Sequence, residues 1–148
     1  MDFVIEELQL DDCKACSDIE VSCFKSESMS IDDFFQAIED PDKLFYVAKS
    51  GGRIVGLCGI LVAVDSADIL TIAVGEAVRR HGIGRMLLDK LASAAREKGV
   101  LSIILEVRAS NKGAIVFYEE YGFERISVRY NYYREPMEDA VIMKLVIA

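Results

Sequence analysis

One stretch of the sequence limits the fold more than any other, because its apolar periodicity changes from that of a strand to that of a helix and back. Residues 67–74 are predicted to be a strand, residues 82–98 a helix and residues 101–108 a second strand. A helical crossover joins parallel strands, so these two strands are predicted to pair in parallel. Ligands of such a unit bind outside the carboxyl ends of its strands, which are residues 74–84 and 106–111 here.

The rest of the chain predicts an α/β domain of the α+β kind, in which most neighbouring strands are antiparallel. Further strands are expected at residues 3–8, 44–49, 53–64, 123–133 and 140–147, and further helices from Asp11 or Asp12 to Phe24, from Ser30 to the residue before Pro41, and at residues 111–121. Short links at residues 50–52 and 65–66 predict antiparallel neighbours. The predicted order is β-α-α-β-β-β-α-β-α-β-β, which gives a mixed sheet of about seven strands with about four helices.

The composition predicts one domain at residues 1–148 that does not bind nucleic acid. Of the 148 residues, 52% are hydrophobic and 28% are charged, which is ordinary for a single globular domain. The net charge of -8 disfavours nucleic-acid binding, which needs an excess of Lys and Arg, and fits a cationic acceptor better. The first ten residues lack the basic start of a secretory signal, and no apolar run is long enough to cross a membrane. We therefore expect a cytoplasmic protein without a membrane partner, and the sequence leaves its oligomeric state open.

The four cysteines raise the alternative of a redox or metal site. Cys13 and Cys16 have the spacing of a redox pair or of half a zinc site. A structural zinc site needs four ligands, and Cys23, Cys58 and His81 provide no second matching pair. Cys13, Cys16 and Cys23 also recur at helical intervals, which favours buried thiols and no metal.

The segment after the strand at residues 67–74 is predicted to bind an anion. It contains, in order, Arg79, Arg80, His81, Gly82, Ile83, Gly84 and Arg85. The two glycines allow backbone N–H groups to approach an anion, and the dipole of the following helix favours negative charge there. It is neither a P-loop nor a Rossmann fingerprint, because Leu87 stands where the latter needs glycine. The residues alone leave a second interpretation open, a tight loop with solvated arginines.

The same segment resembles the coenzyme A motif of the GNAT N-acetyltransferases. The matching residues are Arg79-x-x-Gly82-x-Gly84, preceded by Ile72-Ala73-Val74. Further similar segments cover most of the chain: Leu105-Glu106-Val107-Arg108-Ala109-Ser110-Asn111, Phe117-Tyr118, Tyr121-Gly122-Phe123, Asn131-Tyr132-Tyr133 and Glu138-Asp139-Ala140. Together they resemble the ribosomal-protein N-terminal alanine acetyltransferases, the RimI-type branch of that family. The resemblance implies the GNAT fold, in which the sheet splays at a bulge beside the acetyl-coenzyme A site.

The resemblance also implies where acetyl-coenzyme A, the co-substrate, would bind. Backbone groups of Ile72, Ala73 and Val74 would lie beside the thioester, and the amides of residues 80–85 would bind the pyrophosphate. Asn111 resembles the asparagine that contacts the coenzyme, and it is equally a good helix N-cap. We expect no catalytic role for His81, because the pyrophosphate loop faces away from the thioester.

Two residues resemble the catalytic pair of the family, Glu106 as general base and Tyr118 as general acid. A base is useful because a peptide N-terminal amine, with a pKa of about 7.7–8.0, must be neutral to attack a thioester. A tyrosine, with an ordinary pKa of about 10, is protonated at pH 7 and can donate its proton to the leaving thiolate. The residues alone leave two alternatives open: an ion pair between Glu106 and Arg108, and simple core packing of Tyr118.

The acceptor is predicted to be the N-terminal amine of a peptide or protein, and the resemblance points to a ribosomal protein. Tyr130, Tyr132 and Tyr133 lie where the RimI-type family contacts its peptide, although packing at a hairpin tip is an alternative for them. Phe24 begins the acceptor-facing segment, in which the family usually has a Pro-Trp pair and this chain has neither residue. A small-molecule amine acceptor, a coenzyme A-binding module without transfer activity, and a redox domain at Cys13 and Cys16 are the alternative functions.

Overall fold

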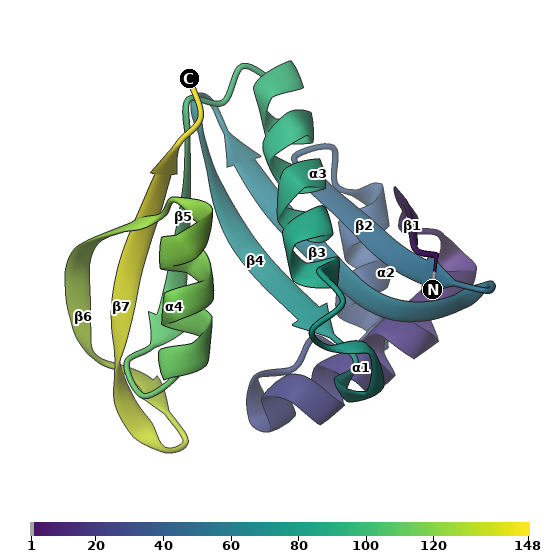
Figure 1. Cartoon of the computed structure of the whole chain (residues 1–148), viewed down its shortest axis with the longest axis horizontal. Coiled ribbons are helices and arrows are strands. Elements are labelled where there is room, and N and C mark those ends of the chain that lie inside the picture. The colour runs from purple at the N-terminus through teal and green to yellow at the C-terminus, as the bar shows by residue number, and fades with distance from the viewer. Residues whose placement is uncertain (1) are drawn as a thin grey trace.

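The computed structural model describes residues 2–148 as one seven-stranded sheet between two layers of helices (Figure 1). The strands are β1 Val4–Glu7, β2 Lys43–Ser50, β3 Arg53–Ala63, β4 Ser66–Val74, β5 Ser102–Arg108, β6 Glu124–Arg134 and β7 Met137–Val146. The helices are α1 Cys13–Phe24, α2 Ile31–Glu39, α3 Ile83–Glu97 and α4 Lys112–Tyr121, with short 3-10 turns η1 Leu10–Asp12, η2 Lys25–Glu27 and η3 Glu76–Val78. Across the sheet the strands run in the order β1-β2-β3-β4-β5-β7-β6. The predicted fold class and order of elements are confirmed.

The β4–β5 pair is the one parallel pair among the described strands, as predicted, and it is short. Residues 66–68 of β4 pair with residues 102–104 of β5, and beyond this point β4 remains paired only with β3 and β5 only with β7. A bulge at Leu70, between the paired residues Ile69 and Thr71, lies just after the end of the parallel pairing. The sheet therefore separates into two halves, β1–β4 and β5-β7-β6, that diverge towards one end (Figure 1).

The two faces of the sheet are covered by different helices. α3 and α4 cover one face, and α1 and α2 cover the other (Figure 1). The predicted stripe of α3 is buried in the larger core: Ile83, Leu87, Leu91 and Ala95. A helix that repeats apolar residues every three or four positions buries one face, and truncating one of these leucines to alanine would cost about 2–5 kcal/mol. α3 is thus a rigid support for the loop at its N-terminus.

The smaller core, between the sheet and α1 and α2, contains two of the four cysteines. Cys13, Cys16 and Cys58 are buried, Cys23 is half-buried, and all four are free thiols. Burial raises the pKa of Cys13 and raises that of Cys16 to about 12. A redox pair needs the opposite shift, towards a stable thiolate. These thiols act as small apolar side chains in the core.

Two local details differ in how well the sequence predicted them. The helix expected from Ser30 begins with a full capping box, in which Ser30 and Asp33 each accept a hydrogen bond from the other's backbone N–H. β7, in contrast, begins three positions before the predicted residue 140, because a tight turn at Glu135 and Pro136 pairs Arg134 with Met137.

No helix within residues 2–148 is long and apolar enough to span a membrane.

Candidate functional site

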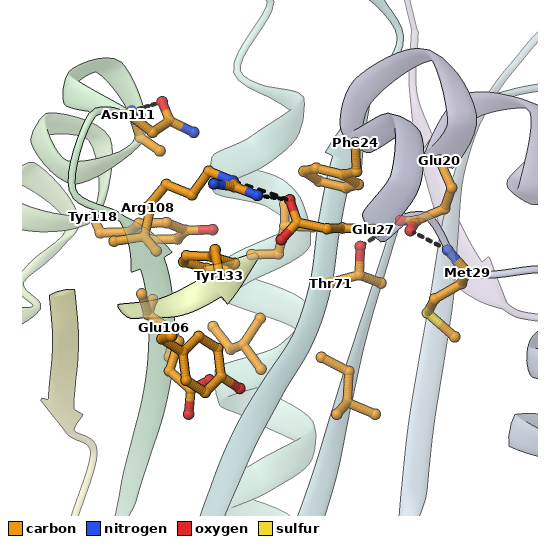
Figure 2. Close-up of a pocket in the computed structure, with 17 residues that line it drawn as sticks. Glu20, Phe24, Glu27, Met29, Thr71, Glu106, Arg108, Asn111, Tyr118 and Tyr133 are labelled. Carbon is orange, nitrogen blue, oxygen red and sulfur yellow. Dashed lines mark hydrogen bonds and ion pairs between the residues drawn. The ribbon is translucent and has the colours of Figure 1, made fainter. Parts of the chain in front are cut away.

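A pocket of about 390 Å³ lies where β4 and β5 diverge (Figure 2). It is lined by Glu20 and Phe24 of α1, Glu27 and Met29 of the α1–α2 connection, residues 69–72 of β4, residues 105–108 of β5, Asn111, Ala114 and Tyr118 at α4, and Tyr132 and Tyr133 of β6. The divergence of the two half-sheets leaves this space, and side chains from both halves line it. The predicted pair Glu106 and Tyr118, and the acceptor candidates Phe24, Tyr132 and Tyr133, are all brought together here.

Glu106 is half-buried in the pocket wall, and its partners come from β6. Its Oε1 lies 3.4 Å from Nη1 of Arg129, whose side chain is 59% exposed. The Glu106 carboxylate also raises the pKa of the neighbouring Tyr132 hydroxyl. The alternative of an ion pair between Glu106 and Arg108 is wrong, because Arg108 is held by Glu27 and Glu138.

Tyr118 of α4 lies in the pocket wall between two aromatic rings. The ring centroids of Phe117 and Phe123 lie 5.3 and 5.4 Å from that of Tyr118, both in edge-to-face contact. Burial raises the pKa of Tyr118 to about 12, with a smaller contribution from Cys58. The hydroxyl is therefore fully protonated at neutral pH. Tyr118 therefore packs against the core and also forms part of the pocket wall.

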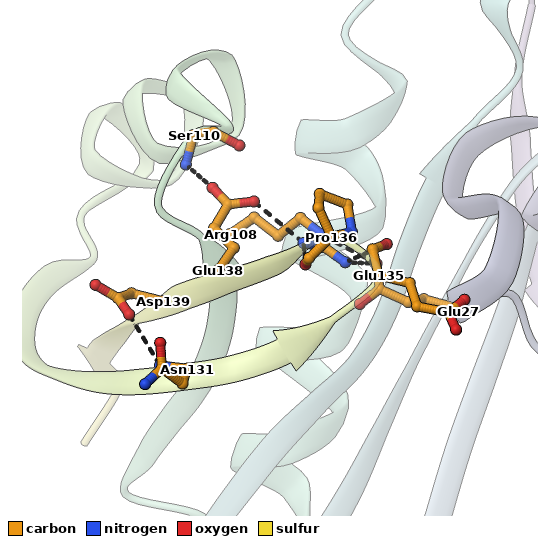
Figure 3. Close-up of polar contacts among 8 residues, drawn as sticks. All are labelled: Glu27, Arg108, Ser110, Asn131, Glu135, Pro136, Glu138 and Asp139. Atoms are coloured by element: carbon orange, nitrogen blue, oxygen red, sulfur yellow. Dashed lines mark hydrogen bonds and ion pairs between the residues drawn. The ribbon is translucent and has the colours of Figure 1, made fainter.

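The predicted tyrosine cluster is divided by a bulge in β6. The pairing of β6 with β7 is irregular between Arg129 and Tyr133, and Asn131 has a φ of 54°. The backbone N–H of Asn131 donates to Oδ1 of Asp139 at 2.9 Å, which fixes this conformation (Figure 3). Consecutive side chains of a regular strand point to opposite faces, yet Tyr132 and Tyr133 both line the pocket. Tyr130 is 78% exposed and is not among the lining residues.

A buried carboxylate, Glu20, was missed by the sequence analysis. It is 1% exposed and accepts hydrogen bonds from the Thr71 hydroxyl, at the β4 bulge, and from the Met29 backbone N–H at 3.0 Å (Figure 2). Burial raises its pKa above the ordinary value, partly offset by these hydrogen bonds. In the sequence, Glu20 could have been recognised because it is the one acidic residue on the helical stripe that contains Cys13 and Cys16.

The predicted pyrophosphate segment lies outside this pocket, at the N-terminus of α3. Gly82 is the N-cap, with a φ of 77°, and the first helical hydrogen bond runs from the Met86 N–H to the Gly82 carbonyl at 3.1 Å. The N–H groups of residues 83–85 therefore have no partner within the helix. Arg80, His81, Gly82 and Arg85 are exposed, which leaves this helix end open to an anion.

Two residues of this segment have further contacts that the sequence did not predict. The Arg79 side chain turns back towards β4, where its Nε donates to the Val74 carbonyl at 3.2 Å. A Cβ added at Gly84 would lie 3.1 Å from the Phe117 ring, so this glycine also permits α3 to approach α4.

Of the predicted thioester and asparagine positions, Ile72 and Asn111 line the pocket, and Ala73 and Val74 continue β4 beyond it. Ile72, Ala73 and Val74 follow the point at which β4 loses its β5 partner, so their edge facing β5 is unpaired. The Asn111 side chain caps α4 by accepting from the Ala114 N–H at 3.2 Å, and it also lines the pocket. Within residues 2–148, no three His, Cys, Asp or Glu side chains are grouped to hold a metal ion.

Comparisons with known proteins agree with this geometry. The family model described as "Acetyltransferase (GNAT) family" matches residues 8–123. The chain is 40% identical over 107 residues to the [ribosomal protein bS18]-alanine N-acetyltransferase of Escherichia coli strain K12, covering 71% of this chain and 72% of that protein. It is 33% identical to the N-alpha-acetyltransferase RimI of Mycobacterium tuberculosis, covering 90% and 85%.

Two solved structures are similar over almost their whole length. The ribosomal-protein-S18-alanine N-acetyltransferase from Escherichia coli has a TM-score of 0.88 at 33% identity, covering 99% of this chain and 95% of that one. Ard1 from Thermoplasma volcanium has a TM-score of 0.90 at 29% identity, covering 100% and 99%.

Proposed function

Because this chain belongs to the GNAT family and is an N-acetyltransferase, we propose that it transfers the acetyl group of acetyl-coenzyme A to the N-terminal α-amine of a protein. The main support is the position of Glu106 and Tyr118, which line one pocket from two different elements. The relatives that are named for alanine N-acetylation of a ribosomal protein support an N-terminal acceptor of that kind.

The residues of the chain fit the co-substrate in two respects. The edge of residues 72–74 that has no β5 partner offers backbone groups to the amide groups of the pantetheine arm, and the Val74 carbonyl is the one that already accepts from Arg79. The free N–H groups of residues 83–85 and the side chains of Arg80 and Arg85 suit the pyrophosphate. When bound, acetyl-coenzyme A supplies the activated acetyl thioester.

Glu106 would act as the general base. An N-terminal amine is partly protonated at neutral pH, since its pKa is about 7.7–8.0, and only the neutral form attacks. Glu106 would take the proton, directly or through a water molecule. Its pairing with Arg129 does not prevent this role, because an ion pair this exposed is weak and can be exchanged.

Tyr118 would act as the general acid. Its raised pKa of about 12 means that the hydroxyl retains its proton until the developing thiolate needs it. The attack of the amine and the departure of the sulfur then require no covalent intermediate on the enzyme. The N–H groups near Val74, which β5 leaves unpaired, are available to the oxyanion of the tetrahedral intermediate.

Incubation with acetyl-coenzyme A and a library of N-terminal peptides, read by mass spectrometry, tests the proposal. A panel of small-molecule amines run in parallel would reveal a different acceptor class. Glu106→Gln and Tyr118→Phe are each expected to lower kcat/KM on the best peptide by about 10²–10⁴-fold. Full turnover by both variants would refute the catalytic assignment, and acetylation of amines alone would refute the acceptor.

A further inference from the structure

Arg108, which lines the pocket, uses all five of its N–H donors (Figure 3). Nε and Nη2 donate to Oε1 of Glu27 at 3.0 and 2.8 Å. Nη1 donates to the Pro136 carbonyl at 3.0 Å and to Oε1 of Glu138 at 3.1 Å, and Nη2 also donates to the Glu135 carbonyl at 3.2 Å. Such complete use fixes the guanidinium in one position.

These contacts divide into two groups with different roles. Glu135, Pro136 and Glu138 belong to the β6–β7 hairpin, in the same half-sheet as Arg108, and the guanidinium also lies 4.3 Å from the centroid of the Tyr133 ring. Glu27 belongs to the connection between α1 and α2, which packs on the other half. Within residues 2–148, its two hydrogen bonds with Arg108 are the only side-chain hydrogen bonds from residues 25–30 to the β5-β7-β6 half.

The Glu27 contact is the exchangeable one. The Glu27 side chain is 38% exposed, and an ion pair with this much access to water is weak. If Glu27 left, Arg108 would still be neutralised by Glu138, which is 18% exposed and is anchored by the Ser110 N–H at 2.5 Å. The guanidinium would then keep its position and present two free donors, Nε–H and one Nη2–H.

These two donors are suited to one oxygen atom, because both now converge on Oε1 of Glu27. A backbone carbonyl of a peptide is such an oxygen. Glu106 and Arg108 lie two residues apart on the same face of β5, or about 6.6 Å along the strand. An amine at Glu106 therefore places the first or second carbonyl of an extended peptide near Arg108, since each residue spans about 3.3–3.6 Å.

We propose that Arg108 binds a backbone carbonyl of the acceptor through Nε and Nη2, and that Glu27 occupies this position when no acceptor is bound. This inference depends on the proposed function, since it requires a peptide acceptor. It makes Arg108 a residue that distinguishes peptides from amines without a nearby carbonyl, and Glu27 an internal competitor of the substrate.

The test compares acceptor KM values for a peptide that the wild-type enzyme acetylates and for two analogues. In one analogue the first backbone carbonyl is reduced to CH₂, and in the other the second is reduced. We expect one analogue to raise KM by about tenfold with wild-type enzyme, the equivalent of one or two hydrogen bonds. Arg108→Gln is expected to raise the KM of the intact peptide similarly and to remove the difference between peptide and analogue.

The Glu27 variants test the competition. Glu27→Ala is expected to lower the peptide KM by about threefold. The same substitution in the Arg108→Gln background should have no effect. Arg125→Gln, which removes a surface ion pair of β6 with Glu119, is the matched control and should leave all constants unchanged. The KM for acetyl-coenzyme A reports on folding, because a misfolded Arg108 variant would change it as well.

The possible failures can be told apart. If the wild-type enzyme acetylates no N-terminal peptide, the proposed function fails and this inference fails with it. If peptides are acetylated but both analogues match the intact peptide, only this inference is wrong. A rise in peptide KM with Glu27→Ala would also overturn it, because Glu27 would then bind the acceptor itself.

Discussion

The two sides of the opening between β4 and β5 are built in different ways. On the α3 side, the proposed coenzyme segment is one continuous stretch, residues 72–85, supported by a helix whose buried stripe holds it rigidly. On the α1 side, the proposed acceptor wall combines three separate segments that meet through side chains, and Glu27 and Arg108 are 81 residues apart. Local backbone geometry thus forms one side, and long-range polar contacts form the other. Substitutions should therefore affect the two substrates separately.

The largest effect that would separate the two sides is expected for Gly84→Val. The added side chain would meet the Phe117 ring, which a single Cβ already approaches to 3.1 Å, and would push α4 away from the start of α3. Overpacking costs about 1–3 kcal/mol of stability, and a misplacement of the loop by about 1 Å is expected to lower kcat/KM for acetyl-coenzyme A by about 100-fold. Steady-state kinetics should show an acceptor KM within twofold of wild type. Gly84→Ala is the milder control. If the variant impaired the kinetics of both substrates equally, the two sides of the opening would not act separately.

Asp139→Ala should have the converse effect, on the acceptor alone. It removes the carboxylate that accepts the Asn131 N–H and thereby fixes the bulge that directs Tyr132 and Tyr133 to the pocket. We expect a rise of about tenfold in acceptor KM, the equivalent of one hydrogen bond to a charged group. The KM for acetyl-coenzyme A should not change. Asp139→Asn keeps an acceptor oxygen, so its acceptor KM should remain close to that of wild type. A large rise in that KM would show that the negative charge of Asp139 has another role.

Asn111→Ala tests whether Asn111, which caps α4 and lines the pocket, is only a helix cap or also contacts the coenzyme. Loss of the N-cap bond to the Ala114 N–H should lower the free energy of unfolding by about 0.5–2 kcal/mol, as measured by urea denaturation. Asn111→Asp or Asn111→Ser keeps the cap and should restore stability. If these capping variants also restore the KM for acetyl-coenzyme A, Asn111 is a cap only. If KM stays raised in the stable variants, the amide contacts the coenzyme.

The smallest effect is expected for Glu20, on the α1 side, and concerns the pH dependence of stability. Burial raises the folded-state pKa of Glu20 above its ordinary 4.5, so the folded protein holds this proton to a higher pH than the unfolded chain does. Its contribution to stability is present below that ordinary value and is lost as pH rises through the raised pKa. Denaturation of wild type and Glu20→Gln between about pH 4 and 8 should show wild type losing stability relative to the variant. A difference that is independent of pH would contradict this assignment.

The sequence predicted the β4–loop–α3–β5 unit and the buried stripe of α3 because these depend on the spacing of residues close together in the chain. The Ser30 capping box is equally local, since its two partners are three residues apart. Glu106 and Tyr118 were named from the resemblance, and their residue types suit the roles. The start of β7 was misplaced because a tight turn, rather than an apolar run, determines where that strand begins.

What the sequence by itself determined is the order of elements, which follows from local periodicity, and the segment proposed to bind the coenzyme, which follows from the resemblance of a short motif to that of the family. Only the tertiary structure decided the partners of the charged groups. Arg108 pairs with Glu27 and Glu138 instead of Glu106, and the buried Glu20 reaches Thr71, because α1 packs against β4 and β5 pairs with β7 beside the β6–β7 turn. Ion pairs of this kind depend on three-dimensional distance, which no spacing along the chain specifies.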